Sequence, residues 1–350
     1  MKFVKYLILV FIVVSGIVFL AYRSGINNPV NGNGESKEFI IEKGEGVGVI
    51  SHKLKEAELI TSDLFFRIYV QRSGKQSKIQ AGEYRLSSSM SIKEMVEILS
   101  RGEAISSEKT IKFIEGWRSG EMAQYLETEG IFQREELLEV VGFPMVDYSI
   151  EKKVDKPVDY SKDFDFLKDK PKKYGLEGYL FPDTYRIYEN ASIDDIVRKM
   201  LGNLDKKLTP KMREDIKSQG KSIYEIITMA SIIQKEVRSV EDMKLVSGVF
   251  WNRIGIGQAL ESCATLAYIL GVDKAQYSQA DTEVDSLYNS YKYRDLPPGP
   301  IANPGLKAIE AAIYPTESDY LYFLSRSDNG ETVFSKTYNE HLRNKAKYIK

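Results

Sequence analysis

Glu236 is the residue whose position in the sequence best suits acid chemistry. It closes the apolar segment MASIIQKE (229–236). Ser222 and Glu225 form an S-x-x-E pattern, which predicts that a helix begins there, and a similar pattern at Ser239 predicts the start of the next helix. We therefore expect Glu236 in the last turn of a helix.

The predicted surroundings of Glu236 should raise the pKa of its carboxyl group. Three apolar residues precede it on the same side of the predicted helix: Ile233, Ile232 and Met229. Such a stripe faces the protein interior, where desolvation disfavours the carboxylate, and the negative end of the helix dipole disfavours it further. A carboxyl group that keeps its proton can act as a general acid. The alternative is a solvated glutamate balanced by Lys235 and Arg238.

Three further segments combine aromatic rings with polar side chains: LEGYLFPDTYRI (176–187), IGQALESCAT (256–265) and YNSYKYRDLPPGPIANPG (288–305). Aromatic faces stack on the apolar side of a sugar ring, while amides, hydroxyls and carboxylates bond its hydroxyl groups. The 22 tyrosines of the chain also favour a carbohydrate ligand, although weakly. The alternative for each segment is loop scaffolding around a tyrosine-rich core.

The composition excludes several classes of function. Basic and acidic residues nearly cancel, at a formal net charge of −1, and no block of basic residues occurs, so nucleic acid is not expected as a partner. One cysteine and two histidines offer no metal-ligand spacing, so we expect no metal and no cofactor. A cysteine peptidase that uses Cys263 and His341 is disfavoured, because no motif supports a nucleophile at that cysteine.

The N-terminal residues predict a membrane anchor. Residues 6–22 form an uncharged apolar run between Lys5 and Arg23, at the short end of the lengths that span a bilayer. A cleaved signal peptide is the alternative, but no small-residue cleavage site follows the run. The lysines before the run outweigh Arg23, so residues 1–5 are expected in the cytoplasm and everything after Arg23 outside.

The rest of the chain predicts an α+β protein with two folded parts. Residues 37–104 alternate strand-like and helix-like segments, which predicts a small α+β unit. Residues 105–350 are predicted to form a larger, mainly helical unit that contains Glu236. Residues 23–36, rich in Gly, Asn and Ser, predict a flexible stalk, and the charged residues 144–173 predict an exposed connection or insertion.

A series of motifs follows one another between residues 176 and 341: LEGYLFPDTY, ASIIQKE, VFWNRI, LESCAT, YNSY with LPPGPIANPG, YLYF and FSKTYNEH. Together with the N-terminal anchor, this series closely resembles the YceG-like family of endolytic murein transglycosylases. The resemblance implies a LysM-like subdomain at residues 37–104 and a lytic transglycosylase catalytic domain at residues 105–350. It also implies that Glu236 is the catalytic glutamate.

The resemblance further implies a mechanism with a single carboxyl group. Protonated Glu236 would donate to the oxygen between N-acetylmuramic acid and N-acetylglucosamine, and its carboxylate would then take the proton of the muramyl C6 hydroxyl. A 1,6-anhydro ring closes and no water is consumed. In this interpretation the predicted substrate-binding residues are Glu177, Tyr179, Asp183, Tyr185, Asn252, Gln258, Glu261, Ser262, Tyr288, Asn289, Tyr291, Gly299 and Asn303.

Two other functions stay open from the sequence. A peptidoglycan hydrolase needs a second carboxylate, and Glu177 or Glu261 could join Glu236 in that role. The other is a non-catalytic, membrane-tethered protein that binds peptidoglycan as a scaffold. The masses of the products separate the two enzymes, because a transglycosylase product is one water lighter than a hydrolysis product.

The predicted anchor gives an expected location. A single span with a cytoplasmic N-terminus places the catalytic part on the outer side of the inner or cytoplasmic membrane. A stalk of about 15 residues keeps it within a few tens of Å of that membrane, so newly made glycan strands are the expected substrate. Peptidoglycan synthases are a further expected partner.

Overall fold

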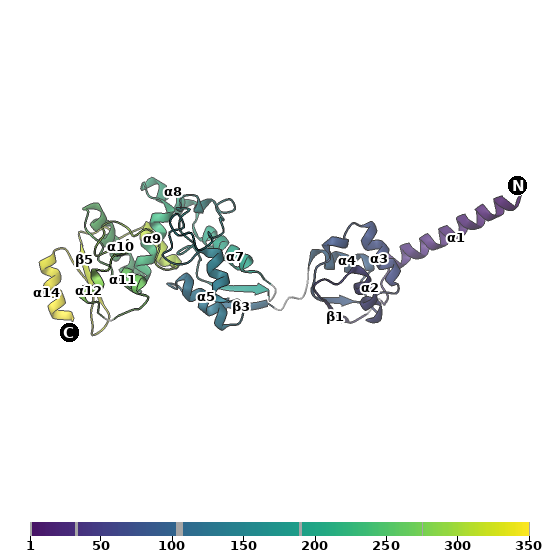
Figure 1. The fold of residues 1–350 in the computed structure, drawn as a ribbon, viewed down its shortest axis with the longest axis horizontal. Helices are drawn as coiled ribbons and strands as arrows, with labels where there is room; N and C mark the ends of the chain where they lie inside the picture. Colours follow the sequence, from purple (N-terminus) through teal and green to yellow (C-terminus); the bar gives the residue numbers. More distant parts are fainter. Residues whose placement is uncertain (1, 32–33, 103–107, 189–190, 275, 350) are drawn as a thin grey trace. The chain divides into compact units, whose positions relative to one another are not determined.

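The computed structural model describes residues 2–31, 34–102, 108–188, 191–274 and 276–349, with the side chains of these residues from residue 11 onward except at residues 12 and 108. The chain divides into two compact units (Figure 1). Unit 1 comprises Met1–Lys109 with Tyr188–Asn190, and unit 2 comprises Thr110–Ile187 with Ala191–Lys350. The predicted boundary between residues 104 and 105 lies outside the described residues.

Unit 1 is a small α+β fold around one antiparallel strand pair. Its elements are α1 (Lys2–Asn27), β1 (Ser36–Ile41), α2 (Val47–Glu56), α3 (Asp63–Arg72), the 3-10 helix η1 (Gln76–Lys78), β2 (Gly82–Ser87) and α4 (Ile92–Arg101). β1 pairs with β2 so that Phe39 lies opposite Tyr84. Both rings join the apolar side chains of α2, α3 and α4 in the core of this unit. The LysM-like character of this unit stays a prediction.

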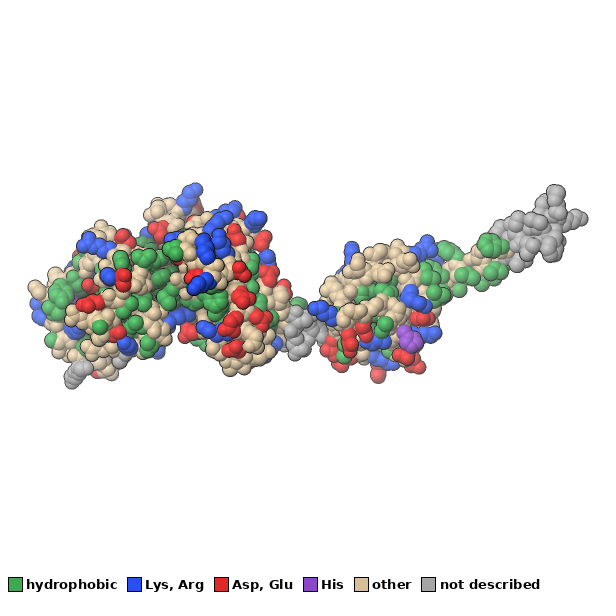
Figure 2. Space-filling view, viewed as in Figure 1, with side chains coloured by type: hydrophobic (Ala, Val, Ile, Leu, Met, Phe, Trp, Pro, Cys, Tyr) green, Lys and Arg blue, Asp and Glu red, His purple; other side chains and the backbone are tan. Residues whose placement is uncertain are grey.

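Helix α1 contains the predicted anchor, residues 6–22. The side chains described between Phe11 and Leu20 are largely apolar and exposed (Figure 2). Over the described part of the chain, no helix has both the length and the apolarity that a membrane span requires. The anchor and the cytoplasmic tail therefore stay predictions.

The predicted stalk differs from the structure at its start. Helix α1 continues to Asn27, where residues 23–36 were expected to lack regular structure. Ile26 is buried in the core of unit 1, and the Tyr22 ring meets the Phe65 ring edge-on at a centroid distance of 5.5 Å. These apolar contacts hold the end of the helix against α3, so the Gly and Asn content of the segment was a poor guide there.

Unit 2 is mainly helical, with two short strand pairs. Its elements are β3 (Glu108–Lys112), α5 (Ser119–Thr128), α6 (Arg134–Val141), the 3-10 helix η2 (Asp165–Leu167), β4 (Thr184–Tyr188), α7 (Ile193–Lys207), α8 (Pro210–Ser218), α9 (Ile223–Glu236), α10 (Val240–Gly255), α11 (Cys263–Leu270), α12 (Gln279–Thr282), α13 (Leu306–Ile313), β5 (Tyr322–Ser325), β6 (Thr332–Ser335) and α14 (Tyr338–Tyr348). The first two residues of β3 and the last residue of β4 are counted with unit 1. β3 pairs with β4, and β5 pairs antiparallel with β6. The predicted α+β class is confirmed.

Helix α9 forms the centre of unit 2. Its first turn carries the predicted capping box, because Ser222 accepts from the backbone N–H of Glu225 while the Glu225 carboxylate accepts from the backbone N–H of Ser222. The eight consecutive residues 226–233 are buried, so the helix is covered on all sides, as expected for a helix that is apolar all round. It packs against α13, α10 and α11.

Asn303 joins three segments that are far apart in sequence. Its Nδ2 donates to the Trp117 carbonyl at 3.0 Å and to Glu177 Oε1 at 2.9 Å, while its Oδ1 accepts from the backbone N–H of Leu180 at 3.0 Å. The side chain is fully buried, and a buried amide is stable only when its donors and acceptors are paired. Asn303 therefore fixes the Pro- and Gly-rich loop against the rest of unit 2.

The predicted exposed insertion, residues 144–173, is partly a core segment. Tyr148, Tyr160 and Phe166 are buried, and the Phe166 ring stacks on Tyr179 at a centroid distance of 6.0 Å. Isolated aromatic residues anchor this irregular segment. The absence of an apolar period reflects its lack of long regular elements and was wrongly taken as evidence of exposure.

We expect Gly178→Ala to destabilise unit 2 more than Gly220→Ala. Both glycines have positive φ, 87° and 68°, so each substitution strains the backbone by about 1–2 kcal/mol. At Gly178 an added Cβ would also lie 2.4 Å from the Pro300 Cβ, whereas Gly220 has open space around it. The added overpacking should cost about 1–3 kcal/mol more.

Denaturant titration followed by tryptophan fluorescence measures this difference for unit 2 alone. The two tryptophans of the chain, Trp117 and Trp251, both lie in unit 2. Equal losses of unfolding free energy in the two variants would show that the contact with Pro300 is not tight.

Candidate functional site

Glu236 is the last residue of α9, as predicted. The backbone leaves the helix at Val237, whose φ of −142° is extended. Met229, Ile232 and Ile233, the predicted stripe behind Glu236, are fully buried. The glutamate itself is half-buried, so a rigid apolar helix ends in a carboxyl group that is partly exposed.

The N-terminus of α11 faces this carboxyl group. Ser262 Oγ donates to Glu236 Oε1, and the backbone nitrogen of Ala264 lies 3.4 Å from the same oxygen. Ser262 holds the N-cap position of α11, yet its side chain makes no capping bond to its own helix. The hydroxyl that would normally cap α11 is therefore used to hold Glu236.

Burial raises the pKa of Glu236 above its ordinary value. The hydrogen bonds from Ser262 and Ala264 act in the opposite direction, because both stabilise the charged form, but burial is the largest effect. Both bonds fall on Oε1. Among the hydrogen bonds of the described residues none involves Oε2, so the second oxygen is left to carry a proton that can be transferred.

The loop at residues 288–291 fixes the start of α11. Ser290 Oγ accepts from the backbone N–H of Ser262 at 3.0 Å and lies 2.8 Å from Thr265 Oγ1. Asn289 is fully buried and donates to the carbonyls of Thr282 and Val284, at 3.0 and 2.8 Å. Asn289 thus shapes the loop, and its burial leaves it no surface for the substrate contact we predicted.

Two other predicted residues lie close to the start of α11. Tyr291 is half-buried, and its hydroxyl is 3.1 Å from Cys263 Sγ at the first position of α11. Glu261 pairs with Arg253 Nη1 at 3.0 Å and has a left-handed backbone, with φ of 52°. The structure therefore brings Ser262, Tyr291 and Glu261 to the helix start that faces Glu236.

Asn252 and Gln258 face a different segment. Asn252 Nδ2 donates to the carbonyls of Ser318 and Tyr320, at 2.7 and 3.1 Å. Gln258 Nε2 is 3.4 Å from the Tyr322 hydroxyl. Both side chains hold the chain that leads into β5, which is a structural role.

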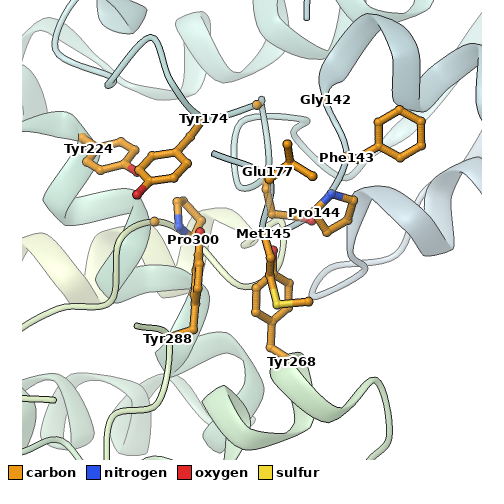
Figure 3. A pocket seen from close by; sticks show the side chains of 13 residues that line it. Gly142, Phe143, Pro144, Met145, Tyr174, Glu177, Tyr224, Tyr268, Tyr288 and Pro300 are labelled. Carbon is orange, nitrogen blue, oxygen red and sulfur yellow. The ribbon is translucent and has the colours of Figure 1, made fainter. Parts of the chain in front are cut away.

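A second group of predicted residues forms a small recess, in which Glu177, Tyr288 and Gly299 lie together (Figure 3). Glu177 accepts from the backbone N–H and the hydroxyl of Ser119, at 2.9 and 2.8 Å, and from Asn303. Burial raises the pKa of Glu177 to about 7, against the effect of these donors. Its carboxyl group thereby fastens the first turn of α5 to the Pro- and Gly-rich loop.

The remaining predicted residues serve the fold. Tyr179 is fully buried, and Tyr185 is buried with its hydroxyl donating to the Phe181 carbonyl at 2.6 Å. Asp183 is exposed and accepts from Asn203 Nδ2 at 2.9 Å. With Asn303 and Asn289, the two buried tyrosines are corrections to the predicted substrate contacts, because their side chains are enclosed by protein.

The cysteine-peptidase alternative finds no support in the geometry. The hydrogen bonds of the described residues pair Cys263 with Tyr291, and His341 stacks on Tyr322 at a centroid distance of 5.4 Å. Burial raises the pKa of the Cys263 thiol, which disfavours the thiolate a nucleophile needs. In the described ranges, no three His, Cys, Asp or Glu side chains come together as a metal site would require.

The model of the YceG-like family matches residues 39–347 of this chain. The chain belongs to the YceG-like family. The endolytic murein transglycosylase of Bacillus subtilis is 32% identical to it over 330 residues, which are 94% of this chain and 89% of that protein. The endolytic murein transglycosylase of Streptococcus pneumoniae D39 is 31% identical over an alignment of 360 positions, which covers 96% of this chain and 65% of that protein.

A solved structure resembles the fold of this YceG-like chain. The crystal structure of a YceG-like protein from Listeria monocytogenes aligns with a TM-score of 0.58 and 30% identity, over 89% of this chain and 100% of that chain. The family predicted from the motifs is confirmed, and the predicted enzyme class, a lytic transglycosylase, agrees with the names of relatives matched over nearly the whole chain.

Proposed function

We propose that this chain is an endolytic peptidoglycan transglycosylase that cleaves the bond between N-acetylmuramic acid and N-acetylglucosamine and leaves 1,6-anhydro ends. The observation that carries the proposal is Glu236, a carboxyl group with a raised pKa at the junction of α9 and α11. The names of the relatives give the polymer, murein. The surroundings of Glu236 support the proposed chemistry.

In the first step Glu236 acts as the acid. The proton leaves Oε2 for the glycosidic oxygen while positive charge develops at the muramyl C1. Ser262 and Ala264 donate to Oε1, so they stabilise the carboxylate as it forms. Burial favours the protonated form of the Glu236 carboxyl group, and the two donors favour the carboxylate that remains when the proton is released.

In the second step the same carboxylate acts as the base. It takes the proton of the muramyl C6 hydroxyl, whose oxygen bonds to C1 and closes the anhydro ring. The proton lost in the first step is thereby recovered, and no water enters the product. The hydrogen bond from Ser262 holds the carboxyl group in one orientation through both steps.

The two-carboxylate alternative is weakened by the positions of its candidates. Glu177 uses its oxygens to hold Ser119 and Asn303, and Glu261 is paired with Arg253. A hydrolase would need one of them to release its partners and turn toward a water molecule.

The predicted anchor defines where such an enzyme would act. An apolar N-terminal run on helix α1 would hold unit 2 at the outer side of the cell membrane, with residues 1–5 in the cytoplasm. Newly made strands are the glycan nearest to that surface. Contact with peptidoglycan synthases belongs to the same proposal.

We expect Glu236→Gln to abolish cleavage while the fold is kept. Loss of a group that serves as acid and then as base should lower the rate at least roughly a thousandfold. Glu241→Gln is a matched control, because Glu241 is an exposed glutamate in the first turn of the neighbouring helix α10.

Purified glycan strands digested by the full-length chain and weighed by mass spectrometry provide the measurement. Wild type and Glu241→Gln should give products with anhydro ends, and Glu236→Gln should give none. If Glu236→Gln digested the strands at a rate comparable to wild type, Glu236 would not be a catalytic residue.

Ser262→Ala should shift the pH dependence of cleavage to higher pH. Ser262 lowers the pKa of Glu236, so its removal raises that pKa further and the protonated acid persists to higher pH. The rate at the optimum should fall roughly tenfold or more, because a hydrogen bond to a charged group is lost.

Initial rates of anhydro-product formation across a pH series test this directly. The alkaline limb of the kcat/KM profile in the variant should lie at higher pH than in wild type. An unchanged limb with a lower rate would mean that Ser262 contributes only packing.

A further inference from the structure

Arg253 is a buried cation that the proposed steps do not use. It belongs to the VFWNRI motif (249–254) and lies in the last turn of α10. A guanidinium group is stable in the interior of a protein only when its N–H donors and its charge are paired. The partners of Arg253 therefore show which part of the structure it holds.

Four consecutive residues before α11 are partners of Arg253. Its backbone carbonyl accepts from the N–H of Gln258 at 2.8 Å. Its Nη1 donates to the carbonyls of Ala259 and Leu260, at 3.0 and 2.8 Å, and lies 3.0 Å from Glu261 Oε2. One residue at the end of α10 thus fixes the whole turn that leads into α11.

Glu261 completes this turn. Its carboxylate balances the charge of Arg253, which burial would otherwise make costly. Its backbone has a φ of 52°, in the left-handed region, and its N–H donates to the Ser290 carbonyl at 2.9 Å. A non-glycine residue keeps such a conformation only where its surroundings hold it. Arg253 on one side and Ser290 on the other supply that hold.

The turn matters because Ser262 follows it directly. Ser262 is buried, and its hydroxyl donates to Glu236. Residues 261 and 262 share a peptide bond, so a change in the backbone at Glu261 moves Ser262 as well. The position of the hydroxyl relative to Glu236 therefore depends on the turn that Arg253 holds.

Arg253 is itself held by the segment that leads into β5. Its Nε donates to the Leu321 carbonyl at 2.6 Å, and its guanidinium carbon lies 4.9 Å from the centre of the Tyr322 ring. A lysine would keep the charge, but it lacks the planar fork that reaches both this segment and the turn.

We propose that Arg253 and Glu261 are positioning residues for the reaction. Together they fix the turn before α11, so that the Ser262 hydroxyl stays on Glu236. Neither of the two needs to touch the glycan. The inference rests on the proposed function, because it assumes that Glu236 is the acid. It gives Glu261 a role different from the substrate contact or second carboxylate expected from the sequence.

The central variant is Glu261→Ala in the full-length chain, because Glu261 is exposed and its loss should leave the fold intact. Its matched control is Asp163→Ala, since Asp163 is a similarly exposed carboxylate that pairs with Arg198 at 2.8 Å in the same unit. Glu261→Gln is the conservative variant, because its amide oxygen can still accept from Arg253. Arg253→Lys tests the other member of the pair.

Glu261→Ala should lower kcat for anhydro-product formation about three- to tenfold, the effect of weakening one hydrogen bond to the acid, with KM little changed. Arg253→Lys should act in the same direction, and Glu261→Gln should keep more of the rate. Asp163→Ala should match wild type. A rise in KM with an unchanged kcat in Glu261→Ala would instead make Glu261 a substrate contact and overturn the positioning role.

The pH profile separates positioning from a direct effect of charge. Displacing the Ser262 hydroxyl removes a hydrogen bond that lowers the pKa of Glu236, so the alkaline limb of kcat/KM should move to higher pH. Direct loss of the Glu261 charge would do the reverse, because a nearby carboxylate raises the pKa of another. When Ser262→Ala is already present, adding Glu261→Ala should cause no further shift. A limb at lower pH, or a full further shift in the double variant, would contradict the inference.

The single thiol of the chain reports on the same turn without any catalysis. Cys263 follows Ser262 and is exposed, and its Sγ lies 3.1 Å from the Tyr291 hydroxyl. Alkylation by iodoacetamide, followed by mass spectrometry, should become about twofold faster or more in Glu261→Ala, because local opening exposes the thiol. Asp163→Ala should leave the rate unchanged.

Failure of this inference is distinguishable from failure of the proposed function. Anhydro products from wild type, with an unchanged pH limb and unchanged alkylation in Glu261→Ala and Arg253→Lys, would overturn the positioning role alone. If wild type formed no anhydro product, the transglycosylase assignment would fail and the positioning role with it. The alkylation rates would still show whether the pair fixes the start of α11.

Discussion

The structure of unit 2 depends on placing one carboxyl group between two helix ends of opposite polarity. Glu236 closes α9, where the helix dipole and burial disfavour its charge, and it faces the N-terminus of α11, where Ser262 and Ala264 favour it. Neither burial nor the two hydrogen-bond donors alone would suit a carboxyl group that must first donate a proton and then accept one. Burial alone would hold the proton, and the donors alone would keep the carboxylate ionised. Together these effects leave the pKa of Glu236 raised, while hydrogen bonds from Ser262 and Ala264 still stabilise its carboxylate.

The rest of unit 2 holds the end of α9 and the start of α11 in the positions that expose Glu236 to these two opposing effects. The fully buried middle of α9 fixes where Glu236 emerges, and the 288–291 loop fixes where α11 begins through Ser290. Asn303 and Glu177 tie the Pro- and Gly-rich loop to α5, at the other side of the helical core. Several residues that were predicted to bind the substrate therefore have a structural role, because they hold the elements that position Glu236. Buried amides and hydroxyls of this kind are costly to leave unpaired, which explains why they occur as connected sets.

The sequence predicted the local features of the site and missed the long-range ones. The capping box at Ser222 and the apolar stripe behind Glu236 follow from spacing along one helix, so they could be predicted without the fold. The bond from Ser262 joins residues in different helices, and no periodic pattern encodes it, although a serine just before the apolar run CATLAYIL was a signal for an N-cap. Tyr179, Tyr185 and Asn289 were assigned to the substrate because aromatic and amide side chains suit both sugars and packed loops. Only burial distinguishes the two uses.

The most direct test of the central claim is whether an oxygen atom from water enters the product. If one carboxyl group protonates the leaving oxygen and then activates the C6 hydroxyl, the oxygen that bonds to C1 comes from the sugar itself. Digestion of glycan by the full-length chain in water enriched in oxygen-18 should therefore give anhydro products without the heavy isotope. Incorporation of oxygen-18 at the new reducing ends would show that water is the nucleophile, and the single-carboxyl account of Glu236 would be contradicted.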